Sequence, residues 1–318
     1  MKIVAADWLP YCLPLRRPWQ TSRGVLSERH GRLRRLTTDD GRTGWGDCAR
    51  SRIRHRRSRR HRLRRGMRHL DLAAQGAGLP LNAWLSGRPG SVCCGQRQFW
   101  ADFHRRPQQP GPGRRRRLYR RQAESRRRPG RRRNRRPAKA RRHAAPTLRL
   151  RLDANRAWPL ATAQRFIAAC AGLPIDGLEE PLAAPEPGQL ASLQAAAAFP
   201  LAIDESIHLL DAHFFRHPPV RRLVLKPARH GGLLASTELA LRASASGLEV
   251  IITSALESAC GIATLAHLAA AVAPDAVHGL ATADWLASDI GLSPRVIDGW
   301  MRLPKGNGVG FAMEEALH

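Results

Sequence analysis

Short apolar runs alternate with Ala- and Leu-rich stretches along the C-terminal half of the chain. Runs typical of strands lie at 148–154, 175–179, 201–204, 222–225 and 250–254, with a weaker one near 278–283. Helical spacing of apolar residues falls between them, at 159–172, 188–198, 232–246 and 260–273. The alternation predicts parallel βα units, because parallel neighbours need a crossover connection. Six units, with more expected upstream, favour a closed parallel barrel over a small open sheet.

Residues 1–49 show a different pattern. The apolar run Lys2–Leu9 is followed by Gly31–Thr38, which leads into Asp39-Asp40-Gly41. An Asp-Gly turn flanked by strand-like residues is a strong β-hairpin signal. We therefore expect an antiparallel sheet here, and a helix pattern over 69–87.

Two intervening segments, 50–68 and 89–143, are rich in arginine and follow neither the helical nor the strand period. The chain of 318 residues has 54 Lys and Arg against 25 Asp and Glu, for a net charge of +29. Residues 50–143 hold 32 of those bases and three of the acids, which is the entire excess. A neutral protein is thus interrupted by a basic stretch.

Several classes of protein are excluded by the sequence. No run of 18 apolar residues exists, so we expect no transmembrane span and no membrane partner. The first 30 residues contain Asp7, Arg16 and Arg17 and lack the apolar core of a signal peptide. The six cysteines form no CxxC pair, and neither they nor the thirteen histidines show metal-ligand spacing. We expect a cytoplasmic protein with free thiols.

Three carboxylates end successive strand-like runs. Asp153, Glu179 and Asp204 are 26 and 25 residues apart, one βα unit each, and Lys226 follows 22 residues later. In a parallel barrel these strand ends share one rim, where active sites are built. Converging carboxylates repel one another unless a cation lies between them, and oxygen ligands suit Mg²⁺. A lysine on the same rim can act as an acid or a base.

Each of these residues also has an ordinary alternative. An acidic residue after a strand is often a helix N-cap or a loop residue, and Lys226 alone could be a surface lysine. The recurrence of three carboxylates and one lysine at intervals of one βα unit favours the metal site.

At these positions the sequence resembles the enolase superfamily, and within it the o-succinylbenzoate synthases. The segments that carry the resemblance are Leu152-Asp153-Ala154-Asn155-Arg156-Ala157-Trp158, Leu178-Glu179-Glu180-Pro181, Ile203-Asp204-Glu205-Ser206, Leu225-Lys226-Pro227 and Thr253-Ser254-Ala255-Leu256-Glu257-Ser258. The resemblance implies an N-terminal α+β capping domain over a modified (β/α)₇β barrel of the TIM type. The parts implied are the cap at 1–88, an Arg-rich segment at 89–146 in place of the first barrel strands, the barrel at 147–300, and a segment at 301–318 returning to the cap.

The resemblance also implies a reaction and a set of site residues. Mg²⁺ would be held by Asp153, Glu179 and Asp204, and Lys226 would stabilise the intermediate. Residues near a small-molecule carboxylate substrate would be Ser22, Arg23, Asn155 and Ser254. The implied reaction is the dehydration of 2-succinyl-6-hydroxy-2,4-cyclohexadiene-1-carboxylate in menaquinone biosynthesis, which would make the protein a carbon–oxygen lyase.

One departure from the family pattern concerns the second barrel strand. The family carries Lys-x-Lys there, and the second lysine is the acid/base. Here the place holds Gln122, Ala123, Glu124 and Ser125, and the chain contains no Lys-x-Lys. We therefore expect little or no dehydratase activity from the chain as written.

Our hypothesis for both the arginine excess and the missing motif is a shift of reading frame. Alanine codons of the GCC type become CGC-type arginine codons when read one base out of register. Codons can be chosen for Arg117–Arg126 so that a start one base later yields Gly-Phe-Thr-Val-Val-Lys-Leu-Lys-Val. We interpret 50–68 and 89–143 as shifted-frame translation, with 69–87 in frame between them.

Two other functions are compatible with parts of the sequence. Superfamily relatives that racemise N-acylamino acids, epimerise dipeptides or cycloisomerise muconate use a second acid/base lysine in the place of Lys226. The Arg-rich stretch could instead bind nucleic acid through its charge. It has few aromatic residues and no zinc-knuckle or RGG pattern, so no specific nucleic-acid partner is expected.

Overall fold

The structure is a computed structural model that describes residues 1–21, 24–49, 66–87, 93–95 and 149–314. Two of the residues expected near the substrate, Ser22 and Arg23, lie outside the described residues. So do Gln122–Ser125 and almost all of the two Arg-rich segments.

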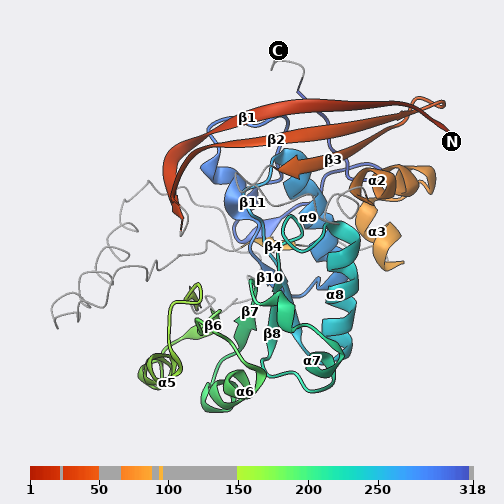
Figure 1. Cartoon of the computed structure of the whole chain (residues 1–318). Coiled ribbons are helices and arrows are strands. Elements are labelled where there is room, and N and C mark those ends of the chain that lie inside the picture. The colour runs from red at the N-terminus through yellow and green to blue at the C-terminus, as the bar shows by residue number, and fades with distance from the viewer. Residues whose placement is uncertain (22–23, 50–65, 88–92, 96–148, 315–318) are drawn as a thin grey trace, which may run out of the picture.

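Three antiparallel strands form the N-terminal sheet. They pair in the order β1 (Ile3–Thr21), β2 (Gly24–Thr38) and β3 (Thr43–Ala49). The expected turn joins β2 to β3, and Gly41 adopts a φ of +80° that disfavours residues with a Cβ. Figure 1 shows this sheet lying across one end of the molecule.

Five parallel strands form a second sheet, as the alternating pattern predicts. Each strand pairs with the next along the chain: β5 (Leu150–Asp153), β6 (Ile175–Glu179), β7 (Leu201–Ile203), β8 (Arg222–Leu225) and β9 (Glu249–Ile252). Every residue of β7 and β8 is buried, which fits a parallel sheet covered on both faces.

The parallel sheet curls further through a short bridge. Thr253, after β9, pairs with Gly279, after β10 (Val277–His278). Strand β10 is parallel to β4 (Cys93–Gly95), and the short hairpin of β11 (Val296–Ile297) and β12 (Trp300–Met301) adds to β4 from its other side.

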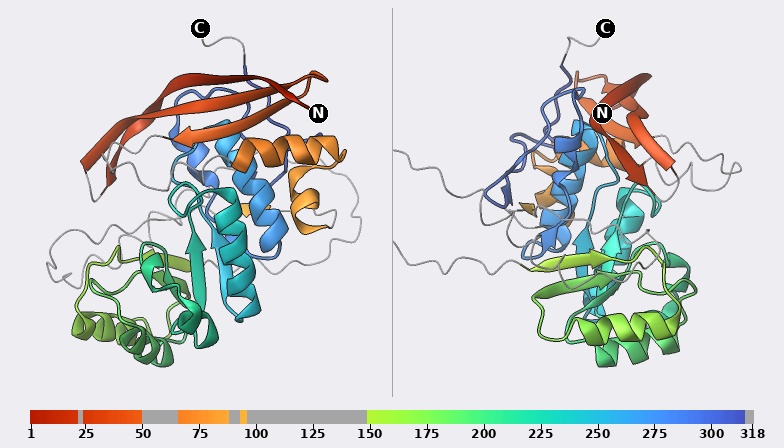
Figure 2. Two further views of the ribbon diagram at one scale, coloured as in Figure 1. Left: turned by 45° about the vertical axis from the view of Figure 1, so that its right-hand side comes forward. Right: turned by 90° about the vertical axis from the view of Figure 1, so that its left-hand side faces the viewer.

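The barrel remains open in the described part of the chain. Within the described residues β5 pairs only with β6, and the chain that connects β4 to β5 is the second Arg-rich segment. The expected barrel is thus confirmed as a curled parallel half-barrel beneath an antiparallel cap, a mixed α/β fold (Figure 2).

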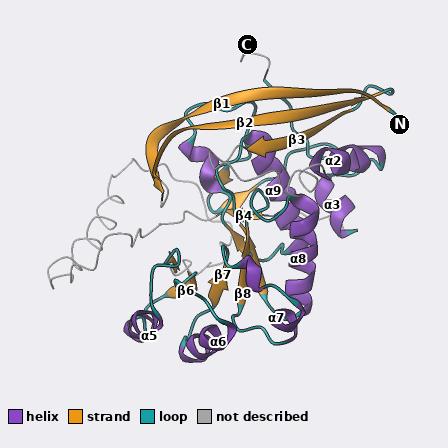
Figure 3. Cartoon of the chain, in the orientation of Figure 1, coloured by secondary structure: helices purple, strands orange, loops and turns teal. Residues whose placement is uncertain are grey.

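Helices cover the outside of the half-barrel (Figure 3). Those of the barrel region are α5 (Leu160–Ala169), α6 (Pro187–Ala196), α7 (Ala212–Arg216), α8 (Leu233–Ala245) and α9 (Ala259–Val272), with 3₁₀ turns η1 (Ile207–Leu209) and η2 (Ala281–Trp285). The sequence predicts four of these helices and not the short α7. None of the helices in the described part of the chain is long and apolar enough to cross a membrane.

Two further helices follow the cap sheet, α2 (Gly66–Gly76) and α3 (Leu81–Ser86). Helix α2 begins before the expected pattern at 69. Helix α9 is buried from Ala259 to Ala270 and packs against α3. Because α9 is buried on all sides, it is apolar all round. Its many small alanine side chains allow neighbouring elements to pack closely against it.

Candidate active site

The four residues picked out by spacing all lie at the carboxyl ends of neighbouring parallel strands. Asp153 and Glu179 are the last residues of β5 and β6, and they pair with each other in the register. Asp204 directly follows β7, and Lys226 directly follows β8. All four side chains are largely buried.

A tight turn after β5 orients Asp153. The Asn155 backbone N–H donates to Asp153 Oδ1 at 2.7 Å, and Asn155 and Arg156 both have positive φ values, 47° and 59°. Asn tolerates this left-handed conformation better than most residues. The turn is pinned to the next strand, because the Arg156 N–H donates to the Glu180 carbonyl at 2.8 Å.

The sequence does not single out Glu180, although it stands beside Glu179. Its Oε1 accepts the N–H groups of Asp204 at 2.8 Å and Ser206 at 2.7 Å. Its Oε2 accepts the Ser206 hydroxyl at 2.6 Å. Glu180 therefore fixes the backbone that carries Asp204, and its own φ of 44° points the chain away from the strand.

Lys226 forms a buried ion pair with Asp204 through its Nζ and Oδ2. His230 lies in the loop that follows, where its Nδ1 accepts the Lys226 backbone N–H at 3.1 Å. The His230 Nε2 is 3.6 Å from Asp204 Oδ1. His230 thus supports both members of the ion pair, a role the sequence does not predict because it arises from the shape of this loop.

The rim carries more buried carboxylates than buried positive charges. Burial raises the pKa of Asp153 to about 7 and that of Glu179 to about 8, against the opposing effect of Lys226. Burial alone would lower the pKa of Lys226, but the charges of Asp204 and Glu179 raise it above its usual value. One buried ammonium group therefore faces more than one carboxylate.

This donor set fits a hard divalent cation. Glu179 Oε2 and Asp204 Oδ1 are buried and have no hydrogen-bond partner among the described residues. Buried acceptors without a donor are costly unless a cation is present. The oxygens of the three carboxylates do not all lie within 4.8 Å of one another in the described structure, where Lys226 supplies the countercharge to Asp204.

Ser254 also reaches the rim, one strand beyond Lys226. Its hydroxyl donates to the Gly279 carbonyl at 3.1 Å and lies 2.7 Å from the Thr282 hydroxyl. The cap approaches this side, since Trp19 of β1 stacks on Trp285 of η2 with ring centroids 5.3 Å apart.

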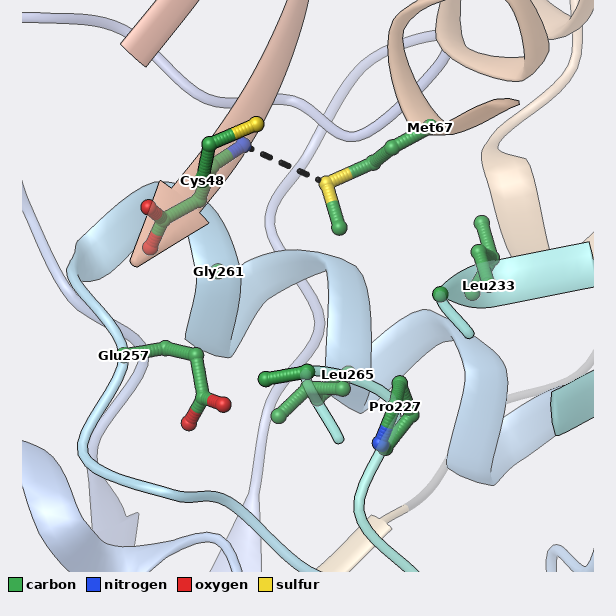
Figure 4. A pocket seen from close by; sticks show the side chains of 10 residues that line it. Cys48, Met67, Pro227, Leu233, Glu257, Gly261 and Leu265 are labelled. Atoms are coloured by element: carbon green, nitrogen blue, oxygen red, sulfur yellow. Dashed lines mark hydrogen bonds between the residues drawn. The ribbon is translucent and has the colours of Figure 1, made fainter. Parts of the chain in front are cut away.

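A small pocket lies between cap and barrel, beside the loop that follows Lys226 (Figure 4). Cys48, Met67 and Pro227 line it, and the Asp47 N–H donates to Met67 Sδ at 3.4 Å. The buried Glu257 also lines it, and burial raises the pKa of that carboxyl to about 7. Most of the lining is apolar, and Asp153, Glu179 and Asp204 are not among the residues that line this pocket.

A family described as "Enolase C-terminal domain-like" matches residues 118–317 of the chain. The chain belongs to the enolase superfamily. The match begins inside the Arg-rich segment and includes all four rim residues.

Curated relatives of this enolase-superfamily chain include several o-succinylbenzoate synthases. The one from Klebsiella pneumoniae (strain 342) is 37% identical over 142 residues, which is 44% of each chain. The one from Pectobacterium atrosepticum is 34% identical over 150 residues, or 46% of each. The matches therefore span less than half the length of these relatives.

Solved structures of the superfamily show the same fold over nearly the whole chain. The muconate lactonizing enzyme from Pseudomonas fluorescens gives a TM-score of 0.76 at 20% identity, covering 99% of this chain and 97% of that one. The L-Ala-D/L-Glu epimerase from Bacillus subtilis gives 0.75 at 19% identity, covering 98% and 99%. At such identities the likeness establishes the fold and leaves the reaction open.

Proposed function

We propose that this chain carries the active site of an o-succinylbenzoate synthase from which the acid/base lysine is missing. The observation that carries the proposal is the meeting of Asp153, Glu179 and Asp204 with Lys226 at one rim. The reaction is proposed from the curated relatives, which are o-succinylbenzoate synthases over the matched stretch. The substrate would be 2-succinyl-6-hydroxy-2,4-cyclohexadiene-1-carboxylate, converted in the cytoplasm during menaquinone synthesis.

Asp153, Glu179 and Asp204 would hold Mg²⁺. When bound, Mg²⁺ supplies positive charge that stabilises the negative charge developing on the substrate carboxylate. The unpartnered oxygens of Glu179 and Asp204 and the raised pKa values at this rim support this assignment.

The chain's own residues would bind and orient the substrate. Lys226 is held as an ammonium ion by Asp204, so it offers positive charge to an electron-rich intermediate rather than a base. Asn155, in the turn after β5, and Ser254, after β9, would offer polar groups to the substrate. In the dehydration, the proton α to the carboxylate is removed, the C–O bond to the hydroxyl group breaks, and water is released.

Proton removal requires a base, and the position expected to supply it holds Gln122–Ser125. General acid–base catalysis contributes about 10²- to 10⁴-fold to rate. We propose that the Arg-rich stretches arose from shifted reading frames, and that restoring the frame restores the Lys-x-Lys strand.

The first experiment compares the chain as written with a frame-restored chain. We expect o-succinylbenzoate formation, followed by its absorbance, to be at least about 10²-fold faster in the restored chain. The matched control is the restored chain with the second lysine of its Lys-x-Lys changed to Met, which should fall to the rate of the written chain. Equal activity of the written and restored chains would refute the missing-base proposal.

Two further measurements separate the parts of the proposal. Sequencing the DNA across codons 50–146 tests the frame shifts directly, since an unbroken frame confirmed by reads removes them. Mg²⁺ titration calorimetry on the restored chain should lose its signal in Asp204→Asn and keep it in the exposed variant Glu186→Gln. A restored chain that epimerises dipeptides and makes no o-succinylbenzoate would overturn the choice of reaction.

A further inference from the structure

The capping sheet holds a second set of metal-binding side chains. Cys12 of β1 and Glu28 and His30 of β2 each offer one ligand atom, and these atoms all lie within 4.8 Å of one another. The Cys12 Sγ is 3.4 Å from Glu28 Oε2 and 4.0 Å from His30 Nε2, and Glu28 Oε1 is 2.7 Å from His30 Nε2. No other described group of three or more His, Cys, Asp and Glu residues meets this criterion.

The strand register places these side chains together on the outer face of the sheet. Cys12 is directly opposite His30 in the β1–β2 pairing, and Glu28 lies two residues before His30 on the same face. Tyr11 and Leu13, on either side of Cys12, are buried toward the barrel. Cys12 therefore points away from the barrel and from the rim carboxylates.

The ligand types select the kind of cation. A thiolate, an imidazole and a carboxylate are ligands of Zn²⁺, whereas Mg²⁺ takes oxygen ligands. Around a tetrahedral Zn²⁺, with bonds of about 2.0–2.3 Å, ligand atoms are roughly 3.3–3.7 Å apart. Of the three observed distances, 3.4 Å lies within that range, 2.7 Å below it and 4.0 Å above it, so changes of less than about 1 Å bring all three ligand atoms to tetrahedral spacing.

We propose that Cys12, Glu28 and His30 form a surface site for a thiophilic divalent cation of the Zn²⁺ class. The thiolate and the carboxylate offset the two charges of the ion. The fourth position faces solvent and takes a water molecule, as in zinc sites with three protein ligands.

The site lies where it can brace the tip of the β1–β2 hairpin. The regular pairing is interrupted between Pro14 and Trp19, and Glu28 belongs to the last regular pair before that interruption. Beyond it, Trp19 stacks on Trp285 beside the barrel rim. A bound ion would tie β1 to β2 at the base of this tip.

Cobalt absorption tests the site in the full chain. With a phosphine reductant present, Co²⁺ should produce a thiolate-to-metal charge-transfer band in the near ultraviolet, and Zn²⁺ should abolish it. Cys12→Ser should remove the band, and Glu28→Gln and His30→Gln should each weaken Co²⁺ binding by about tenfold or more. The matched control is Cys48→Ser, a cysteine of β3 outside the cluster, which should leave the band unchanged.

Two results would overturn the proposal: no charge-transfer band, or a band that survives Cys12→Ser. All three side chains are at least partly exposed, so the variants should fold, and circular dichroism checks this. The rim carboxylates offer only oxygen ligands and give no thiolate band. The outcome is therefore independent of the proposed magnesium site.

Discussion

At the scale of single residues, the Glu180 carboxylate has a structural role: it binds the segment Asp204–Ser206. It is 1% exposed and accepts three hydrogen bonds from the residues that carry Asp204. Glu179, one residue earlier, has an oxygen without any hydrogen-bond partner among the described residues. The two adjacent glutamates therefore have different roles. Glu180 is fully hydrogen-bonded to protein donors, whereas an oxygen of Glu179 remains available to a cation.

Replacing Glu180 tests this division. Glu180→Ala leaves two buried N–H groups and a hydroxyl without an acceptor, and each unsatisfied buried group costs about 1–3 kcal/mol. We expect a loss of about 3 kcal/mol in the free energy of unfolding, measured with urea. Glu186→Ala, on the exposed surface, should change it by about 0.5 kcal/mol or less. A Glu180→Ala loss no larger than that of Glu186→Ala would contradict the role.

At the scale of elements, the cap is joined to the barrel by the carboxylate of Asp47 at the end of β3. Its Oδ1 accepts the Tyr11 hydroxyl at 2.7 Å, and its Oδ2 accepts the N–H and hydroxyl of Ser258 at 3.1 and 2.8 Å. Ser258 precedes α9, so Asp47 places negative charge at the N-terminus of that buried helix. The cap thus supplies one carboxylate to the N-terminus of α9, and Asp289 supplies another by accepting the Ala259 N–H at 2.9 Å.

Removing the Asp47 carboxylate should weaken the junction of cap and barrel. Asp47→Ala leaves the Tyr11 hydroxyl and the N–H of Ser258, the residue before α9, without acceptors, with an expected cost of about 2–4 kcal/mol in chemical unfolding. Asp7→Ala removes a half-exposed pairing with Arg35 from the same sheet and should cost less than about 1 kcal/mol. Similar losses in both variants would show that Asp47 is no more than a surface acid.

The sequence predicts those strands and helices whose own residues carry a recognisable apolar pattern. It does not predict elements that form only through pairing with distant segments. The bounds expected for two strands, 175–179 and 222–225, are those of β6 and β8, because each is a short strand-like segment in a regular alternation with helices. The hairpin β11–β12 is absent from the prediction, since two-residue strands exist only through their pairing with β4 and with each other.

In the candidate site too, the sequence predicts the residues that follow a local pattern and misses those brought together by the fold. Asp153 and Lys226 are found by regular spacing along the chain. The contacts of His230 with Lys226 and Asp204 depend on a loop conformation, and the meeting of Cys12 with His30 depends on the hairpin register. The spacing of residues in the sequence predicts neither the His230 contacts nor the Cys12–His30 pairing. Both depend on backbone geometry, which the apolar periodicity does not specify.

At the scale of the whole molecule, two buried histidines connect parts that are distant in sequence. His267 of α9 accepts the Asn82 N–H at 3.3 Å, and its other ring nitrogen is 3.2 Å from the Val309 carbonyl. His278 accepts the Ile252 N–H at 3.0 Å and lies 2.8 Å from the Ala273 carbonyl. The His278 ring serves as acceptor and donor at once, which requires the neutral form. His267 Nδ1 also lies 3.0 Å from Asn82 Oδ1, and burial is what favours the neutral form of that ring.

The burial of these two rings predicts acid sensitivity of the fold. Burial lowers the pKa of His267 to about 4, from about 6.5 in an unfolded chain. Below pH 6.5 the unfolded chain therefore binds the proton more readily, so this contribution is complete above pH 6.5 and is lost as the pH falls toward 4. The loss from His267 amounts to as much as about 3 kcal/mol.

Urea unfolding at pH 7, 5.5 and 4.5 measures the effect in the full chain. Other groups titrate in this range, including Asp153 and Glu179 with raised pKa values, so the informative quantity is the difference between wild type and His267→Gln. Because glutamine does not titrate, the stability advantage of the wild type should shrink steadily toward pH 4.5. His213→Gln, at an exposed position, should give a difference that stays constant. A wild-type advantage over His267→Gln that is equally constant would show that the ring is not held neutral by the fold.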